Sequence, residues 1–291
     1  MPRIGLIGVG FIGALLLEAA REDGYDVACF DIDDSRKSVA LEHGGDWVAS
    51  PRDAAKDADA VILAVPGAPE VESLLSGDDD ILSVMDAGTL LIDTSTTGPD
   101  VATAAAEWCN ERGISFVTAP LTRAAPVGGI HMLVGGSADD YDTASDLLDT
   151  VSRRHIRIGT PAEAQIFKLI LQIRYASHEA VDAEIVAFAR DQGLDPSIYE
   201  DFLELGISDG YLERDFSQNL TGMGGLRIWH KDIGYGLDVA GESGTATPIA
   251  NAVYEAYKHG VRVADTRDDV GSATTILNYW ERLNSTDTTP K

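Results

Sequence analysis

A glycine-rich run near the start of the chain constrains the fold more than any other feature. Residues 3–9 form an apolar run, residues 8–13 read GVGFIG, and helical periodicity follows. Between a strand and a helix, Gly8 permits a tight turn, Gly10 lets a pyrophosphate approach the backbone, and Gly13 lets the helix pack closely. The free N–H groups at the helix start favour phosphate. The run therefore predicts a dinucleotide-binding unit.

An acidic residue follows the second predicted strand, residues 26–30. Asp31 lies 18 residues after the last glycine of the run, where its carboxylate can bind both ribose hydroxyls of NAD. The same carboxylate would repel the 2′-phosphate of NADP. Arg36 could meet such a phosphate, but Asp33 and Asp34 add negative charge against it. The predicted cofactor is therefore NAD.

Buried strands alternate with helical segments through the first half of the chain. Strands are predicted at residues 60–64, 90–92 and 115–119, and SPRD at residues 50–53 is typical of a helix start. Repeated strand–helix units predict an α/β fold, a doubly wound parallel Rossmann sheet domain over residues 1–160. Its ligands should bind beyond the carboxyl ends of the strands.

An all-α domain is predicted for residues 161–291, where it would bind substrate and support dimerisation. Residues 162–192 contain neither glycine nor proline, and Gly193 then ends the predicted helix. Residues 285–291 read as a disordered tail. Further helices are expected at residues 197–205, 228–241, 248–259 and 272–283.

The charge balance limits the possible partners. The chain has 48 acidic and 22 basic residues, a net charge of −26 spread along its length, which disfavours nucleic acid and anionic membranes. Aspartate exceeds glutamate and arginine exceeds lysine, which favours adaptation to molar salt over an ordinary acidic protein.

Residues 4–17 are too short for a membrane span. Cys29 and Cys109 have no partner at ligand spacing, so neither a metal site nor a disulfide is predicted, and a cytoplasmic location is expected.

Lys168 lies on the long predicted helix and is one of only six lysines. Gln172 and Tyr175 follow on the same helix face. A lysine beside a nicotinamide ring can exchange a proton with a substrate oxygen, and Gln172 could orient that oxygen by hydrogen bonding. The alternative is a lysine whose stem lies along an exposed helix surface.

Taken together, these motifs resemble those of the β-hydroxyacid dehydrogenases, which include 3-hydroxyisobutyrate dehydrogenase and sulfolactaldehyde reductase. The resemblance covers nearly the whole chain. Its segments are GLIGVGFIG at residues 5–13, DTSTTGP at 93–99, APLTRA at 119–124, the approach to the lysine at 159–168, and KD at 231–232.

The resemblance implies an NAD-dependent enzyme that interconverts a short 3-hydroxy acid, or a hydroxy sulfonate, and its semialdehyde. It implies that Lys168 is the general acid/base, assisted by Gln172, and that Lys231 closes over the cofactor. The implied cofactor-binding residues are Gly8, Gly10, Phe11, Ile12, Gly13, Asp31, Val65, Pro66, Thr96 and Lys231. The implied substrate-binding residues are Ser95, Thr122, Arg123, Ala124 and Tyr175.

Three departures from the family pattern bear on the site. Thr122, Arg123 and Ala124 replace a Ser-Gly-Gly segment, and arginine adds a fork of charged donors that suits a carboxylate, sulfonate or phosphonate equally. A surface ion pair is the alternative for Arg123. Leu171 and Gln172 replace two asparagines, and the loop before residues 135–136 is about three residues shorter than usual.

Two other functions remain open on the same scaffold. Imine reductases resemble it but typically lack the lysine, and a non-catalytic NAD-binding sensor would tolerate the lost asparagine. The predicted partners are a small acidic substrate and further copies of the chain, as a homodimer or homotetramer, because the long helix offers more apolar surface than one small domain covers. Arg174 and His178 are expected at subunit or domain contacts.

Overall fold

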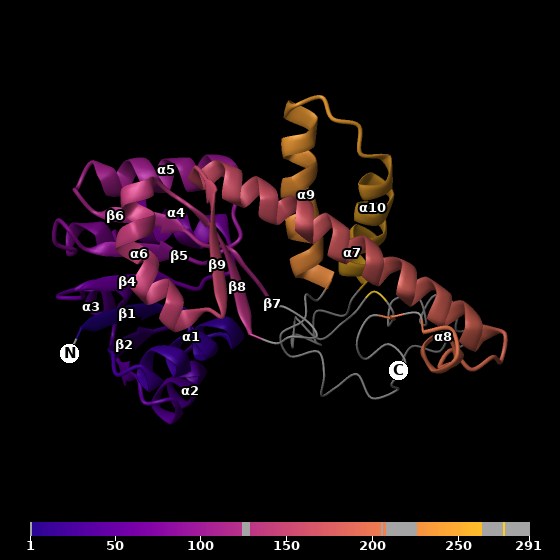
Figure 1. Cartoon of the computed structure of the whole chain (residues 1–291), viewed down its shortest axis with the longest axis horizontal. Coiled ribbons are helices and arrows are strands. Elements are labelled where there is room, and N and C mark those ends of the chain that lie inside the picture. The colour runs from indigo at the N-terminus through magenta and orange to yellow at the C-terminus, as the bar shows by residue number, and fades with distance from the viewer. Residues whose placement is uncertain (1, 124–128, 205, 208–225, 264–275, 277–291) are drawn as a thin grey trace. The chain divides into compact units, whose positions relative to one another are not determined.

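The computed structural model describes residues 2–123, 129–204, 206–207, 226–263 and 276. The chain divides into two compact units, Met1–Lys168 and Leu169–Lys291. Unit 1 contains the sheet, and the described part of unit 2 is helical (Figure 1). The long helix α7, Pro161–Asp191, contributes to both units.

Six parallel strands form the main part of the sheet in unit 1. Their spatial order is β3-β2-β1-β4-β5-β6, so the direction of winding reverses between β1 and β4. This order confirms the predicted doubly wound sheet. In sheets of this kind, ligands bind at the point where the strand order reverses. The strands are β1 (Arg3–Ile7), β2 (Asp26–Phe30), β3 (Asp46–Trp47), β4 (Ala60–Leu63), β5 (Leu90–Asp93) and β6 (Ser115–Thr118).

Helices cover both faces of this sheet because side chains of each strand alternate between two apolar cores. Ile4 and Leu6 of β1 belong to one core with buried residues of α1, α2 and α6, whereas Ile7 belongs to the other, with α3, α4 and α5. Ser50 caps α3 through its hydroxyl, as its sequence predicts. The helices are α1 (Phe11–Glu22), α2 (Lys37–Glu42), α3 (Pro51–Ala55), α4 (Ala68–Ser76), α5 (Pro99–Asn110) and α6 (Ala138–Val151).

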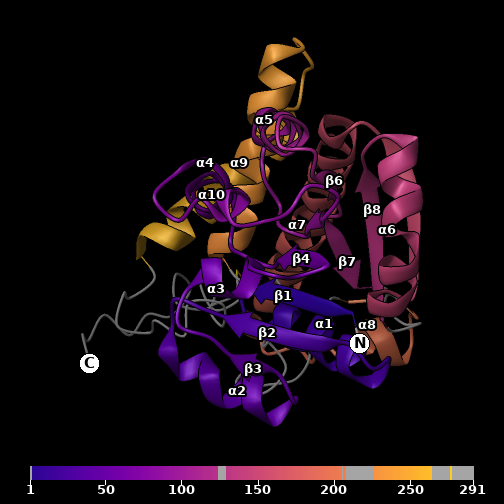
Figure 2. The same cartoon turned by 90° about the vertical axis from the view of Figure 1, so that its left-hand side faces the viewer.

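Three further strands extend the sheet beyond the six parallel strands of the predicted Rossmann fold. β8 (Ile130–Gly135) runs antiparallel to β6 and to β7 (Leu121–Arg123), and it pairs in parallel with β9 (Arg154–Gly159). Helix α6 packs against β6, β8 and β9, and Figure 2 shows it beside β8. Pro120 separates β6 from β7, and the apolar run of β6 ends there in the sequence.

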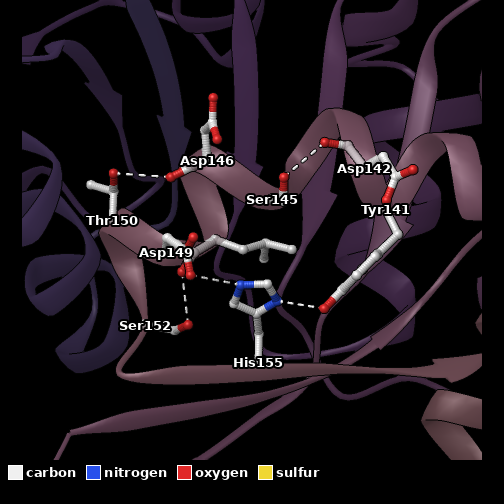
Figure 3. Close-up of polar contacts among 9 residues, drawn as sticks. Tyr141, Asp142, Ser145, Asp146, Asp149, Thr150, Ser152 and His155 are labelled. Atoms are coloured by element: carbon white, nitrogen blue, oxygen red, sulfur yellow. Dashed lines mark hydrogen bonds and ion pairs between the residues drawn. The ribbon is translucent and has the colours of Figure 1, made fainter.

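Side chains of α6 form hydrogen-bond contacts with the edge strand β9. The hydroxyl oxygen of Tyr141 lies 2.9 Å from Nδ1 of His155, and Nε2 of His155 lies 3.0 Å from Oδ1 of Asp149 (Figure 3). The side chain of His155 is only 11% exposed. This pair of contacts ties β9, the strand that leads into α7, to the body of unit 1.

Both ends of α7 are fixed by local contacts. The backbone N–H of Thr160 donates to the Glu163 carboxylate at 2.7 Å, and that of Glu163 donates to the Thr160 hydroxyl at 3.3 Å. The hydrogen bonds from Thr160 lower the pKa of Glu163. Gly193 adopts a left-handed φ of 73° directly beyond the last turn. The helix spans 31 residues, which confirms the predicted length and stop signal.

Unit 2 packs around a small-residue stripe of α7. Ala176 and Ala183 are fully buried against Trp229 and Ile233 of α9 and Tyr257 of α10. The Tyr257 hydroxyl donates to the Ala176 carbonyl at 3.2 Å, and burial raises the pKa of that hydroxyl. Trp229 is therefore a core residue. The remaining described helices are α8 (Ile198–Asp201), α9 (Leu226–Glu242) and α10 (Pro248–Val263).

The helix predicted at residues 197–205 is wrong beyond Asp201. Residues 202–203 form a turn and Glu204 adopts a left-handed φ of 53°, which interrupts helical geometry. The segments predicted at 272–283 and 285–291 lie outside the described residues, apart from Ile276. Among the described helices, none combines the length and the apolar character needed to cross a membrane.

Leu63→Ala should destabilise the fold strongly because Leu63 is fully buried in the centre of the sheet. We expect a loss of about 2–5 kcal/mol in the free energy of unfolding, measured by urea denaturation. Leu41→Ala is the matched control, since Leu41 is 54% exposed, and it should change stability by about 0.5 kcal/mol or less. Equal losses in the two variants would contradict the described core.

Candidate active site

The three glycines of the first loop have separate structural roles. Gly8 has a left-handed φ of 97°, and a Cβ atom there would overlap the Ala64 carbonyl oxygen. A Cβ atom on Gly13 would overlap the Gly8 carbonyl oxygen, so Gly13 permits the close packing of α1 on β1. A Cβ atom on Gly10 would meet nothing within 4 Å. That open space lies at the first turn of α1, which begins at Phe11 without a side-chain cap, and it suits a pyrophosphate.

Asp31 is held against this loop at the end of β2. Its Oδ2 accepts the Val9 N–H at 2.7 Å, and its Oδ1 accepts the Asp33 N–H at 2.9 Å. Nε of Arg36 lies 3.4 Å from the Asp33 carboxylate, and hydrogen bonds from Ser35 lower the pKa of Asp33. Arg36 thus pairs with the neighbouring acid Asp33. The Asp31 carboxylate lies beside the glycine loop, where it is predicted to bind the ribose of NAD.

The ends of β4 and β5 are joined by backbone and side-chain contacts. The Val65 N–H donates to the Ser95 hydroxyl at 3.3 Å, and the Ser95 N–H donates to the buried Asp93 carboxylate at 2.9 Å. Ser95 is buried, whereas Thr96 is half-buried and Pro66 is exposed. These predicted binding residues therefore lie together at the carboxyl edge of the sheet, next to the glycine loop.

Lys168 is buried in unit 1, with 5% of its surface exposed. Its Nζ donates to the carbonyl oxygen of Leu121 in β7 at 2.7 Å. Leu121 directly precedes Thr122, which is half-buried and pairs with His131 of β8. Lys168 therefore does not lie along an exposed helix surface, which was the alternative interpretation of this lysine. The structure instead places the ammonium group against the strand that carries the predicted substrate segment.

Two members of that segment are described only in part or not at all. The backbone of Arg123 pairs with Ile130 at the end of β7. Ala124 lies outside the described residues. The predicted roles of both residues in substrate binding therefore stay predictions.

Two predicted site residues of unit 2, Gln172 and Lys231, meet at a buried acid, Asp232, for which no role was predicted. The Gln172 amide nitrogen donates to Oδ2 of Asp232 at 2.6 Å, and Nζ of Lys231 lies 2.9 Å from its Oδ1. Asp232 is 1% exposed. Lys231 also lies 5.5 Å from the Tyr235 ring centroid. The only sequence signal for Asp232 is its place in the KD pair.

Tyr175 packs against the core of unit 2 and is half-buried. The guanidinium carbon of Arg174 lies 5.7 Å from its ring centroid. This arrangement leaves the predicted role of Tyr175 in substrate binding a prediction.

The cysteines are not reactive groups in this fold. Burial raises the pKa of both Cys29 and Cys109 to about 12, so each thiol stays protonated at neutral pH. In the described ranges of the chain, no three His, Cys, Asp or Glu side chains are grouped to hold a metal ion.

The chain is similar to known proteins over nearly its whole length. A family model described as the NAD binding domain of 6-phosphogluconate dehydrogenase matches residues 3–159. A second, described as NAD-binding of NADP-dependent 3-hydroxyisobutyrate dehydrogenase, matches residues 162–277. The chain is 22% identical to 2-(hydroxymethyl)glutarate dehydrogenase of Eubacterium barkeri, over 97% of this chain and 95% of that one.

Solved structures share the fold. A 3-hydroxyisobutyrate dehydrogenase from Salmonella typhimurium aligns with a TM-score of 0.83 and 20% identity, covering 97% of this chain and all of that one. An imine reductase from Streptomyces aurantiacus aligns with a TM-score of 0.60 and 22% identity, covering 97% and 99%. Both likenesses concern the fold alone.

Asp31→Ser should shift the preference between the two nicotinamide dinucleotides. Removing the carboxylate deletes charge-assisted hydrogen bonds to the ribose, so NADH binding should weaken by about tenfold or more, whereas NADPH binding should weaken less or improve. Fluorescence titration with each dinucleotide measures both constants. Asp34→Ser removes an exposed neighbouring acid and is the control. An unchanged preference in Asp31→Ser would contradict the assignment.

Proposed function

The chain belongs to the β-hydroxyacid dehydrogenases, and we propose that it interconverts a short 3-hydroxy acid and its semialdehyde with NAD as cofactor. One observation carries the proposal. A buried ammonium group, Nζ of Lys168, is held by the Leu121 carbonyl in the unit that also contains the open glycine loop and Asp31. A proton donor and a dinucleotide-binding edge are the two parts that such a reaction needs.

When bound, reduced nicotinamide supplies a hydride to the carbonyl carbon of the semialdehyde. Lys168 donates a proton to the carbonyl oxygen and recovers it in the opposite direction. The Leu121 carbonyl accepts one N–H of Lys168 and so fixes the position of the ammonium group.

Thr122, Arg123 and Ser95 are proposed to hold the acid group of the substrate. The relative 2-(hydroxymethyl)glutarate dehydrogenase is named for a compound whose alcohol lies β to a carboxylate. A guanidinium fork next to Thr122 would bind such a carboxylate through two parallel hydrogen bonds, and it would bind a sulfonate or phosphonate in the same way. The acid group therefore distinguishes substrates of this chain from neutral aldehydes.

Gln172 is proposed to orient the substrate oxygen through its amide oxygen. The Asp232 carboxylate accepts a hydrogen bond from the amide nitrogen, which fixes which end of the amide faces the acid. The amide oxygen is then the end that can accept a hydrogen bond from the hydroxyl form of the substrate. Lys231, paired with the same carboxylate, is proposed to close over the cofactor.

An imine reductase is the second candidate function, since a solved imine reductase shares the fold. The buried lysine favours the hydroxy acid reaction, because imine reductases typically lack a lysine at this position. A non-catalytic sensor is the third candidate. It would bind NADH without turnover of any acid.

A panel of aldehydes tests these three functions against one another. NADH and NADPH oxidation would be followed in molar KCl, the condition that the charge balance predicts, with sulfolactaldehyde, methylmalonate, tartronate and succinate semialdehydes, and glyoxylate, and separately with cyclic imines. Turnover of one member with NADH supports the proposal. Turnover of cyclic imines alone would support the second function, and tight NADH binding without any turnover would support the third.

Lys168→Ala should abolish most of the activity while leaving the cofactor site intact. General acid catalysis contributes about 10²–10⁴-fold, so kcat should fall by that factor, whereas the NADH dissociation constant should stay within about twofold. Lys56→Ala removes an exposed lysine and should change neither value. Full turnover in Lys168→Ala would show that Lys168 is not the proton donor.

We further propose that two copies of the chain pair through an exposed face of α7 in unit 2. Ile170, Val181 and Phe188 are apolar yet 63%, 58% and 65% exposed, and they share one helix face with exposed Arg174 and Glu184. The face is self-complementary in an antiparallel pair. There Ile170 would lie opposite Phe188 of the second copy, and Arg174 opposite its Glu184.

A charge swap tests this dimer. Arg174→Glu and Glu184→Arg should each shift the protein towards monomer, because each places like charges opposite one another, and the double variant should restore the dimer. Light scattering coupled to size-exclusion chromatography measures the mass at several KCl concentrations. A monomeric wild type, or a double variant no better than either single variant, would contradict the arrangement.

A further inference from the structure

Gln165 is a buried polar residue of α7 that the proposed mechanism does not use. Its side chain is fully buried, and its amide makes three hydrogen bonds within unit 1. Oε1 accepts the Thr97 N–H at 3.1 Å, while Nε2 donates to the Ser95 carbonyl at 3.0 Å and to the Thr118 hydroxyl oxygen at 2.8 Å. One acceptor and two donors of the amide are thus used at once.

The three partners of Gln165 lie at the ends of two strands that support the candidate site. Ser95 and Thr97 flank Thr96 in the segment that follows β5, and Thr118 is the last residue of β6. The Ser95 hydroxyl in turn accepts the Val65 N–H at the end of β4. The contacts of Gln165 therefore reach three neighbouring strand ends, directly or through one residue.

Gln165 also precedes Lys168 by three residues, so the two side chains lie one turn apart on the same buried face of the helix. Lys168 contacts the Leu121 carbonyl, just beyond the end of β6. A helix that is fixed by Gln165 to the ends of β5 and β6 holds Lys168 at a set distance from the segment that contains Thr96.

We infer that Gln165 is a positioning residue for the reaction. It fixes the segment 95–97 and the end of β6 against the first turns of α7. The cofactor-binding Thr96, the substrate-binding Ser95 and the proton donor Lys168 are therefore held in one geometry before ligands bind. Such pre-organisation supports both affinity and rate, because a displacement of about 1 Å can cost about a hundredfold in rate. The inference rests on the proposed function for the roles of those three residues.

Gln165→Met tests the inference, since methionine keeps the length of the side chain and loses all three hydrogen bonds. Hydrogen exchange of the peptide that contains residues 94–98 should become at least tenfold faster, because Oε1 of Gln165 protects the Thr97 N–H. The NADH dissociation constant should rise by about tenfold, and kcat should fall by about tenfold to a hundredfold. Gln192→Met, at an exposed glutamine, is the matched control and should change none of these.

Gln165→Glu keeps an acceptor for the Thr97 N–H but cannot donate to the Ser95 carbonyl as a carboxylate. As a carboxylate it should keep slow exchange at Thr97 while NADH binding remains weakened. Thr118→Val removes only one of the three hydrogen bonds and should change exchange and NADH binding in the same direction by a smaller factor, so it covers the case in which Gln165→Met does not fold. Thr118→Val in the Gln165→Met background should add little, because their shared contact is already lost.

Two results would overturn the inference. Fast exchange at residues 94–98 with unchanged NADH binding and turnover would show that Gln165 supports the fold alone. Unchanged exchange would show that its amide does not hold the segment. If the wild type turned over no aldehyde of the panel, the proposed function would fail, but exchange and NADH binding would still decide the role of Gln165.

Discussion

The burial of the Lys168 ammonium group is the interaction on which the rest of the site depends. A charged amine with 5% of its surface exposed has lost most of its water, so the protein must supply polar partners. The Leu121 carbonyl is one of them, and it stays in place because β7 is paired with β8. The short strands β7 and β8 therefore position the proposed proton donor as well as extending the sheet.

The same need for fixed partners explains how the neighbouring elements are arranged. The Thr160–Glu163 capping contacts define where α7 begins, Gln165 fixes its first turns to the ends of β5 and β6, and Lys168 follows on that face. On the other side of the reversal point, Gly8 and Gly13 allow α1 to approach β1. Close packing at the carboxyl edge of one sheet thus fixes the position of the first turn of α1 and the position of the buried Lys168 side chain.

The parts of this structure that depend on local pattern could be predicted from the sequence. The parallel strands are short apolar runs, and α7 is a stretch without glycine or proline between a proline and Gly193. Strands β7 to β9 were missed because none of them is a continuous buried run: β7 has three residues, β8 alternates between buried and half-buried residues at its start, and no residue of β9 is fully buried. Gln165 and Asp232 were missed because a buried amide or acid is recognised only by its partners, and the hydrogen-bond partners of these two side chains lie 47 to 70 residues away. Asp31 was singled out by its spacing from the glycine run, whereas the proposed role of Lys168 came from the resemblance of its helix to the family pattern.

The transfer of deuterium from NADH labelled at the nicotinamide C4 position to the substrate tests the central claim most directly. The product formed from each semialdehyde of the panel would be examined by NMR and mass spectrometry. The account predicts one deuterium on the carbinol carbon of the hydroxy acid, with none entering that carbon from deuterated water. Deuterium at that carbon from solvent, or oxidation of NADH without transfer to any acid-bearing aldehyde, would contradict it.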